Sequence, residues 1–241
     1  MSELRAEGLG KRFGGLRVFQ EISFRLMPGE ILGVIGPNGA GKTTLINVIS
    51  GRLAPSQGQV FVGGRDVTGQ PAHAVSRLGV VRSFQQTNTF RSASVRENIA
   101  RAVRFGRHGT VPPGLEGLLA EFGLTARLDE QSDKLPYGLQ KMLGLLMAFA
   151  TGPEVLLLDE PAAGLERSER HQVDRFMHHV CNQAGCSVLI VEHDMDLIRR
   201  LCPRIMVLDA GLKLADGPPT DVLARPEVIA AYLGETEEGA A

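Results

Sequence analysis

The sequence predicts an α/β fold in which a mainly parallel β-sheet is covered by helices. Two patterns indicate it: strand-like and helix-like segments alternate through the second half of the chain, and a glycine-rich turn joins a strand-like run to a helix near residues 36–43. In addition, 241 residues are enough for one large domain or two modest ones, and with 43% of them hydrophobic they can build a sizeable core. This composition excludes a mainly disordered chain.

The first third of the chain alternates strand-like runs with turns. Apolar side chains at Ile22, Phe24 and Leu26 have the two-residue period of a half-buried strand. A Pro-Gly turn leads into a continuous apolar run, and Gly51 is placed to end the helix that follows. The segments expected here are strands at 16–26, 30–35, 59–62 and 78–84 and a helix at 43–50.

The rest of the chain is predicted to be helical in the middle and alternating afterwards. Helices are expected at 94–105 and 115–122, on either side of a polar, proline-containing break. Buried strands joined by helices, from Gly138 onward, are typical of a parallel sheet. The expected strands are 155–158, 187–191 and 204–208, and the expected helices begin at 138, 167 and 194, the last two ending at 183 and 201.

Charge and composition exclude several function classes. The 26 Lys and Arg residues balance 27 Asp and Glu residues, so the chain lacks the positive field of a general nucleic-acid binder. The most apolar region, residues 142–153, is shorter than the roughly 18 residues that span a bilayer, and the N-terminus has no apolar signal segment. The cysteines, Cys181, Cys186 and Cys202, have no disulfide or zinc spacing, which predicts a reducing, cytosolic location.

Residues 36–43 match the phosphate-binding motif GxxxxGK[ST], between a predicted strand and a predicted helix as the motif requires. The glycines let backbone N–H groups face phosphates, and the helix N-terminus adds positive potential. Lys42 is expected to reach the β- and γ-phosphates of ATP, and Thr43 to bind Mg²⁺. The predicted nucleotide-binding residues are Gly36, Pro37, Asn38, Gly39, Ala40, Gly41, Lys42, Thr43 and Thr44.

A second motif places two acids at the end of a buried strand. Residues 155–158 are apolar and are followed by Asp159 and Glu160. The carboxyl ends of parallel strands form the ligand-binding edge of such a sheet, so both acids are expected there. Asp159 is predicted to hold Mg²⁺ through its water shell, and Glu160 to polarise the attacking water as a general base.

With these motifs the chain resembles an ATP-binding cassette (ABC) ATPase, because further landmarks of that family follow in order. Phe13 matches the aromatic residue that stacks on adenine. Gln85, with Gln86 as the alternative, matches the glutamine that contacts Mg²⁺ and faces the membrane subunits. His193 matches the switch histidine that senses the γ-phosphate. The resemblance therefore implies catalytic roles for Gln85, Glu160 and His193.

The family resemblance also implies an architecture. It is a single domain with a P-loop NTPase core and mainly parallel sheet, an N-terminal antiparallel β subdomain and an inserted α-helical subdomain. Residues 1–91 and 151–234 would form the core with the β subdomain, and residues 92–150 the helical subdomain. Residues 235–241 are small and acidic and are expected to form a flexible tail.

Residues 135–140 fall where the family's signature loop, usually Leu-Ser-Gly-Gly-Gln, precedes a helix. The resemblance implies that this loop binds the γ-phosphate of ATP held by a second copy, so that two chains enclose two nucleotides. The signature residues expected to touch nucleotide are Pro136, Tyr137, Gly138 and Gln140. The chain departs from the usual family residues at Pro136 (Ser), Gly144 (Glu), Met147 (Arg) and Glu166 (Asp).

Within the family, residues 11–15, 135–138, 159–164 and 226–234 resemble branched-chain amino-acid importers. The implied partners are a second ATP-binding subunit, identical or related, integral membrane permease subunits and a solute-binding protein, with no nucleic acid. The chain would lie in the cytoplasm on the inner face of the cell membrane. An exporter subunit, or a nucleotide-binding regulator with weak hydrolysis, remains the alternative. DNA or ribosome machines of this family usually carry two cassettes or a long coiled coil, and one phosphate loop without sustained heptads fits neither.

Overall fold

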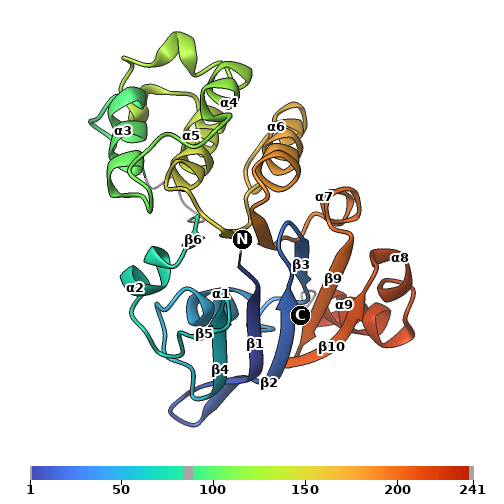
Figure 1. Cartoon of the computed structure of the whole chain (residues 1–241). Coiled ribbons are helices and arrows are strands. Elements are labelled where there is room, and N and C mark those ends of the chain that lie inside the picture. Colours follow the sequence, from blue (N-terminus) through green and yellow to red (C-terminus); the bar gives the residue numbers. More distant parts are fainter. Residues whose placement is uncertain (1, 84–88, 239–241) are drawn as a thin grey trace.

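The computed structural model describes residues 2–83 and 89–238 and contains two β-sheets (Figure 1). The smaller sheet is antiparallel, in the order β2-β1-β4-β5. The larger has the order β10-β9-β3-β8-β7-β6 and is parallel except for the β9–β10 hairpin. The strands are β1 (Leu4–Phe13), β2 (Leu16–Leu26), β3 (Ile31–Ile35), β4 (Gln57–Val62), β5 (Arg65–Asp66), β6 (Val80–Arg82), β7 (Val155–Asp159), β8 (Ser187–Val191), β9 (Arg204–Asp209) and β10 (Leu212–Gly217).

The larger sheet is covered on both faces, which explains the continuous apolar runs of its strands. Along β7, Val155 and Leu157 belong to the core formed with α1 and the antiparallel sheet. Leu156 and Leu158 belong to the core formed with the remaining helices. Successive side chains of a strand point to opposite faces, so a strand between two cores needs no polar positions.

The helices lie between and around the sheets, and α3, α4 and α5 gather at one end of the molecule (Figure 1). The inserted helical segment, the antiparallel sheet and the mainly parallel sheet confirm the α/β fold predicted from the sequence. The α-helices are α1 (Lys42–Ile49), α2 (Ala72–Arg77), α3 (Val95–Phe105), α4 (Leu115–Glu121), α5 (Tyr137–Ala150), α6 (Arg167–His178), α7 (Met195–Leu201), α8 (Pro219–Val222) and α9 (Pro226–Glu238).

Several element boundaries differ from the prediction. Within residues 78–83, the described part of the strand expected at 78–84, only the three residues of β6 form a strand. The unpredicted helix α2 precedes it, starting after Pro71. The helix expected at 167–183 is α-helical only to His178, because the Ala184 N–H bonds to the His179 carbonyl five residues back, in a π-turn. Helix α9 runs through Glu238, so it contains the first four residues of the expected tail. The short elements β5, β10 and α8 were not predicted.

Helix α3 begins with a capping box. The Glu97 N–H donates to Ser94 Oγ at 3.2 Å, and the Ser94 N–H donates to Glu97 Oε2 at 2.8 Å. The next residue, Asn98, is buried and lies one turn after Ser94. It accepts a bond from the Phe90 N–H at 2.8 Å and donates to the Ala93 and Ser94 carbonyls at 3.2 and 2.9 Å. Asn98 therefore ties the segment that contains Phe90 to the helix.

We expect Asn98→Ala to lower the free energy of unfolding by about 3 kcal/mol, since it leaves several buried backbone groups without partners. Urea denaturation of the full chain measures this change. Arg96→Ala, on the same helix, removes an exposed ion pair with Asp129 and should cost less than about 1 kcal/mol. Equal losses in the two variants would contradict the structural role of Asn98.

Candidate active site

The phosphate-binding motif forms the loop between β3 and α1. Gly36 has φ 144°, and a Cβ there would lie 1.9 Å from the Leu208 carbonyl oxygen of β9. Gly41, the residue before the helix, has φ 97°. Both positions thus require glycine. The buried Lys42 ammonium donates to the Gly36 and Pro37 carbonyls at 2.6 and 2.7 Å, which holds it over its own loop.

The start of α1 is suited to an anion. Its first turn contains no acidic residue, and Gly41 supplies no side-chain cap to the N–H groups of that turn. Backbone donors at a helix N-terminus without such a cap attract phosphate, an attraction that the helix dipole strengthens. The loop therefore has the donors and the positive potential that a nucleotide phosphate requires.

Asp159 ends β7 beside this loop, with no exposed side-chain surface. Its Oδ1 lies 3.5 Å from the Thr43 hydroxyl, which donates to it, and its Oδ2 accepts a bond from Arg82 at 2.8 Å. Burial raises the pKa of Asp159, and the charge and hydrogen bond of Arg82 oppose that rise. A carboxylate next to a hydroxyl fits Mg²⁺, which prefers hard oxygen ligands.

Glu160 and His193 meet at the same edge of the sheet. Glu160 has φ 51°, in the left-handed region that non-glycine residues rarely adopt. Its N–H donates to the Val191 carbonyl at 2.8 Å, and its Oε1 lies 2.9 Å from His193 Nε2. Backbone strain in a carboxylate residue at a sheet edge is typical of functional sites.

A pocket of about 200 Å³ brings these groups together. Val18 of β2 contributes to its lining. The predicted residues that line the pocket are Asn38, Gly39, Gly41, Lys42, Thr43, Thr44, Glu160 and His193. Its polar lining includes a buried lysine and a carboxylate paired with an imidazole, and it can hold a phosphate and activate a water next to it.

Two buried charged residues that sequence reasoning missed hold the loop after β7. Lys141 of α5 donates to the Glu160 carbonyl at 2.9 Å and also to the Ala163 carbonyl, while Glu192 accepts from the Ala162 N–H at 2.8 Å. Burial lowers the pKa of Lys141 and raises that of Glu192. A single lysine inside an apolar helix was the available signal for Lys141, because a buried ammonium needs partners.

Several other predicted residues do not line this pocket. Phe13, at the end of β1, is 48% exposed, and the Lys11 ammonium lies 4.9 Å from the centre of its ring. Tyr137 is half exposed at the start of α5, next to Gly164. Gln140 donates to the Leu135 carbonyl at 2.8 Å, within its own loop. Of the remaining predictions, Pro136 precedes α5, Gly138 lies against Glu169, and Gln85 and Gln86 are outside the described residues.

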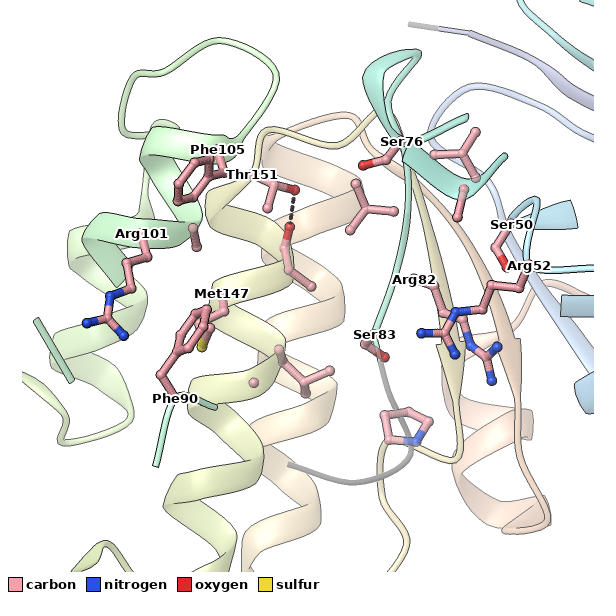
Figure 2. Close-up of a pocket in the computed structure, with 18 of the residues that line it drawn as sticks. Ser50, Arg52, Ser76, Arg82, Ser83, Phe90, Arg101, Phe105, Met147 and Thr151 are labelled. Carbon is pink, nitrogen blue, oxygen red and sulfur yellow. Dashed lines mark hydrogen bonds between the residues drawn. The ribbon is translucent and has the colours of Figure 1, made fainter. Parts of the chain in front are cut away.

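A second hollow, of about 390 Å³, lies between the helical end and the larger sheet (Figure 2). We call it the groove. Figure 2 shows Arg52 and Arg82 on one side of it, with Phe90, Phe105 and Met147 on the other. Its lining is mostly apolar, and Phe105 is 80% exposed. An exposed apolar hollow of this kind is typical of a protein contact.

Comparison with known proteins identifies the family. A profile described as "ABC transporter" matches residues 19–163, and one described as "Branched-chain amino acid ATP-binding cassette transporter" matches residues 213–238. The chain is 36% identical to the high-affinity branched-chain amino acid transport ATP-binding protein LivG of Escherichia coli K12, covering 96% of this chain and 98% of the relative. It is 34% identical to the corresponding protein BraF of Pseudomonas aeruginosa, with the same coverage.

Solved structures agree with this result. The crystal structure of an ATP-binding cassette of an ABC transporter in its ADP conformation superposes with a TM-score of 0.85, at 27% identity, over 97% of this chain and 99% of the other. A nucleotide-free cassette superposes with a TM-score of 0.83, also at 27% identity, over 96% and 99%. The resemblance predicted from the sequence is confirmed. The chain therefore belongs to the ABC transporter family, as one of its ATP-hydrolysing, ATP-binding subunits.

Proposed function

We propose that this chain closes with a second ATP-binding subunit around two Mg-ATP molecules, and that closure and hydrolysis drive uptake of branched-chain or other hydrophobic amino acids by membrane subunits. The observation that carries the proposal is the convergence of the phosphate loop, Glu160 and His193 on one pocket, next to Asp159. The relatives are named for branched-chain amino acid transport, which supports this cargo and favours uptake over export.

The residues divide the work of hydrolysis by position. The loop N–H groups and Lys42 would hold the phosphates, Thr43 would bind Mg²⁺, and Asp159 would hold that ion through its water shell. When bound, that ion would neutralise the charge that develops on the transferred phosphoryl group. Glu160 is placed to accept a proton from the attacking water, while His193 Nε2, at 2.9 Å, orients the carboxylate. The strained backbone of Glu160 fixes the direction of its carboxylate.

The position of the signature residues supports a two-chain site. Pro136, Tyr137, Gly138 and Gln140 do not line the chain's own phosphate pocket. Tyr137 is nevertheless half exposed at a helix N-terminus, where a phosphate of another subunit can approach. Contacts that exist only in the closed pair make nucleotide favour closure, and hydrolysis removes that bias. Pro136 offers no hydroxyl and no N–H, so the remaining loop atoms would carry this contact.

Membrane subunits are the expected partners of the groove. No helix in the part of the chain that the structure describes is long and apolar enough to cross a bilayer. We propose that an apolar segment of a permease subunit occupies the groove, against Phe105, Phe90 and Met147, which places the chain on the cytoplasmic face of the membrane. A solute-binding protein would then deliver the amino acid. In this arrangement residues 92–150 act as a helical subdomain on the core of 1–91 and 151–234.

Affinity purification of the full chain from detergent-solubilised membranes tests this assignment, combined with uptake of radiolabelled leucine by the recovered complex in vesicles. We expect two polytopic permease subunits and ATP-dependent uptake. Recovery of ribosomes or DNA instead would contradict transport. Export of leucine would favour the exporter alternative. Nucleotide binding without turnover would favour the regulator alternative.

Phe105→Ser should reduce recovery of the permease subunits at least about tenfold, because it removes the most exposed aromatic of the groove. The ATPase activity of the isolated chain should not change. Leu212→Ser, at a half-exposed apolar residue of β10 outside the groove, is the matched control and should leave recovery at the wild-type level. Equal recovery of all three proteins would show that the groove is not the docking site.

A further inference from the structure

Arg82 connects the magnesium carboxylate to the helix of the phosphate loop. It ends β6, where its register partner is Leu157, two residues before Asp159 on the adjacent strand. Its side chain is only 9% exposed. One guanidinium nitrogen, Nη2, donates to Asp159 Oδ2 at 2.8 Å, and the other, Nη1, donates to Asn47 Oδ1 of α1. A single rigid group thus spans β7 and α1.

The two oxygens of the Asp159 carboxylate have different partners. Oδ2 accepts from Arg82, whereas Oδ1 lies on the side of the Thr43 hydroxyl, 3.5 Å away. With Oδ2 held by a planar guanidinium that is itself anchored on Asn47, the plane of the carboxylate is set and Oδ1 is directed to the proposed metal ligand Thr43. An ammonium could neutralise the carboxylate but, as a point charge, would not provide this fork.

Stability alone does not explain the contacts of the buried Arg82 side chain. Arg82 Nε is buried with no hydrogen-bond partner among the described residues. A buried unpaired donor costs free energy, and a buried ion pair often contributes little to stability compared with apolar packing. A positioning role accounts for a side chain kept at such a cost.

We propose that Arg82 is a positioning residue for the magnesium site, which orients Asp159 by bonding the carboxylate and Asn47 at once. This inference rests on the proposed function, in which Asp159 serves Mg²⁺. Arg82 also lines the groove, beside Arg52 (Figure 2). A segment seated in the groove would therefore contact the same side chain that orients the metal carboxylate, with no intervening residue.

The test is the magnesium dependence of nucleotide binding by the full chain. Isothermal titration calorimetry with the non-hydrolysable analogue AMP-PNP gives the dissociation constant with Mg²⁺ and with EDTA. The constant in EDTA divided by the constant with Mg²⁺ measures how much magnesium tightens binding. We expect Arg82→Met and Arg82→Lys to lower this ratio at least about tenfold, the usual effect of removing a group that orients a metal ligand. The dissociation constant in EDTA should stay at the wild-type value, a result that a general loss of stability would not give.

Two further variants separate orientation from loss of a buried ion pair. Arg204→Met breaks another Arg–Asp pair, Arg204–Asp216, which is more exposed and lies outside the phosphate pocket, and it should leave the ratio unchanged. In an Asp159→Asn background, Arg82→Met should produce no additional change, because the carboxylate it orients is already gone. Arg82→Lys keeps the charge, so it remains informative if the Met variant does not fold.

The outcomes distinguish this inference from the proposed function. If the wild-type chain binds AMP-PNP equally well with Mg²⁺ and EDTA, or not at all, the proposed Mg-ATP site is wrong. If Asp159→Asn lowers the ratio but both Arg82 variants keep the wild-type value, the metal site stands and the role of Arg82 is overturned. If Arg82→Lys keeps the wild-type ratio while Arg82→Met lowers it, a positive charge is sufficient. That result would also contradict positioning by the two-pronged guanidinium.

Discussion

Glu160→Gln is expected to slow ATP hydrolysis at least about 100-fold, the usual effect of losing a general base, without weakening Mg-ATP binding. The amide keeps the size of the carboxylate and a hydrogen-bonding group toward His193, 2.9 Å away in the wild type, but it cannot take a proton from water. ATP then stays intact, and we expect the variant to accumulate as an ATP-bound dimer. Steady-state phosphate release and size-exclusion chromatography with ATP measure both effects.

Glu154→Gln provides the matched control for this variant. Glu154 directly precedes β7, at the opposite end of the strand from Glu160, and pairs with Arg107. The same chemical change there should leave turnover within about twofold of wild type, because the residue is far along the strand from the phosphate pocket. Near-normal hydrolysis by Glu160→Gln would place the general base at another residue.

Lys42→Ala should abolish detectable hydrolysis, a loss of at least about 100-fold, and also weaken ATP binding. The variant loses the buried cation of the pocket and leaves the Gly36 and Pro37 carbonyls without their donor. A measurement of ATP binding therefore distinguishes the two variants, because Glu160→Gln keeps its affinity for nucleotide, whereas Lys42→Ala binds ATP more weakly. Fluorescent nucleotide titration and phosphate release provide the two measurements.

Lys213→Ala is the control for the loss of a lysine. Lys213 lies on β10, where it donates to the Ser23 carbonyl at 2.8 Å, and it does not line the phosphate pocket. ATP binding and turnover should remain at the wild-type level in this variant. Undiminished ATPase activity in Lys42→Ala would show that the loop does not hold the nucleotide.

Much of the site was predictable because its residues are close in sequence or follow a strand. The loop of residues 36–43 forms a local structure, so spacing and glycine positions predict its conformation. Asp159 and Glu160 follow an apolar run, and the ends of parallel strands converge on one edge. His193 follows β8, so the same rule places it next to Glu160. The order of the family's motifs along the chain provided the remaining basis for the prediction.

Long-range contacts of single charged residues were not predictable. Arg82 looks like the polar end of a short strand, and only the pairing of β6 with β7 brings it to Asp159. Lys141 looks like a polar position on an otherwise apolar helix, and only the packing of α5 against the loop after β7 gives its ammonium the Glu160 carbonyl. Neither contact has a spacing signature in the sequence.

By itself, the sequence determined the class of fold, the phosphate loop, the two acids after β7 and the family, since each of these depends on local spacing or on the order of motifs along the chain. The tertiary structure decided which side chains hold Asp159 and the loop of Glu160, where the groove opens between α5 and β6, and that the signature residues lie outside the chain's own pocket. Those features depend on distances between segments far apart in sequence, which are set by the joint packing of the two cores.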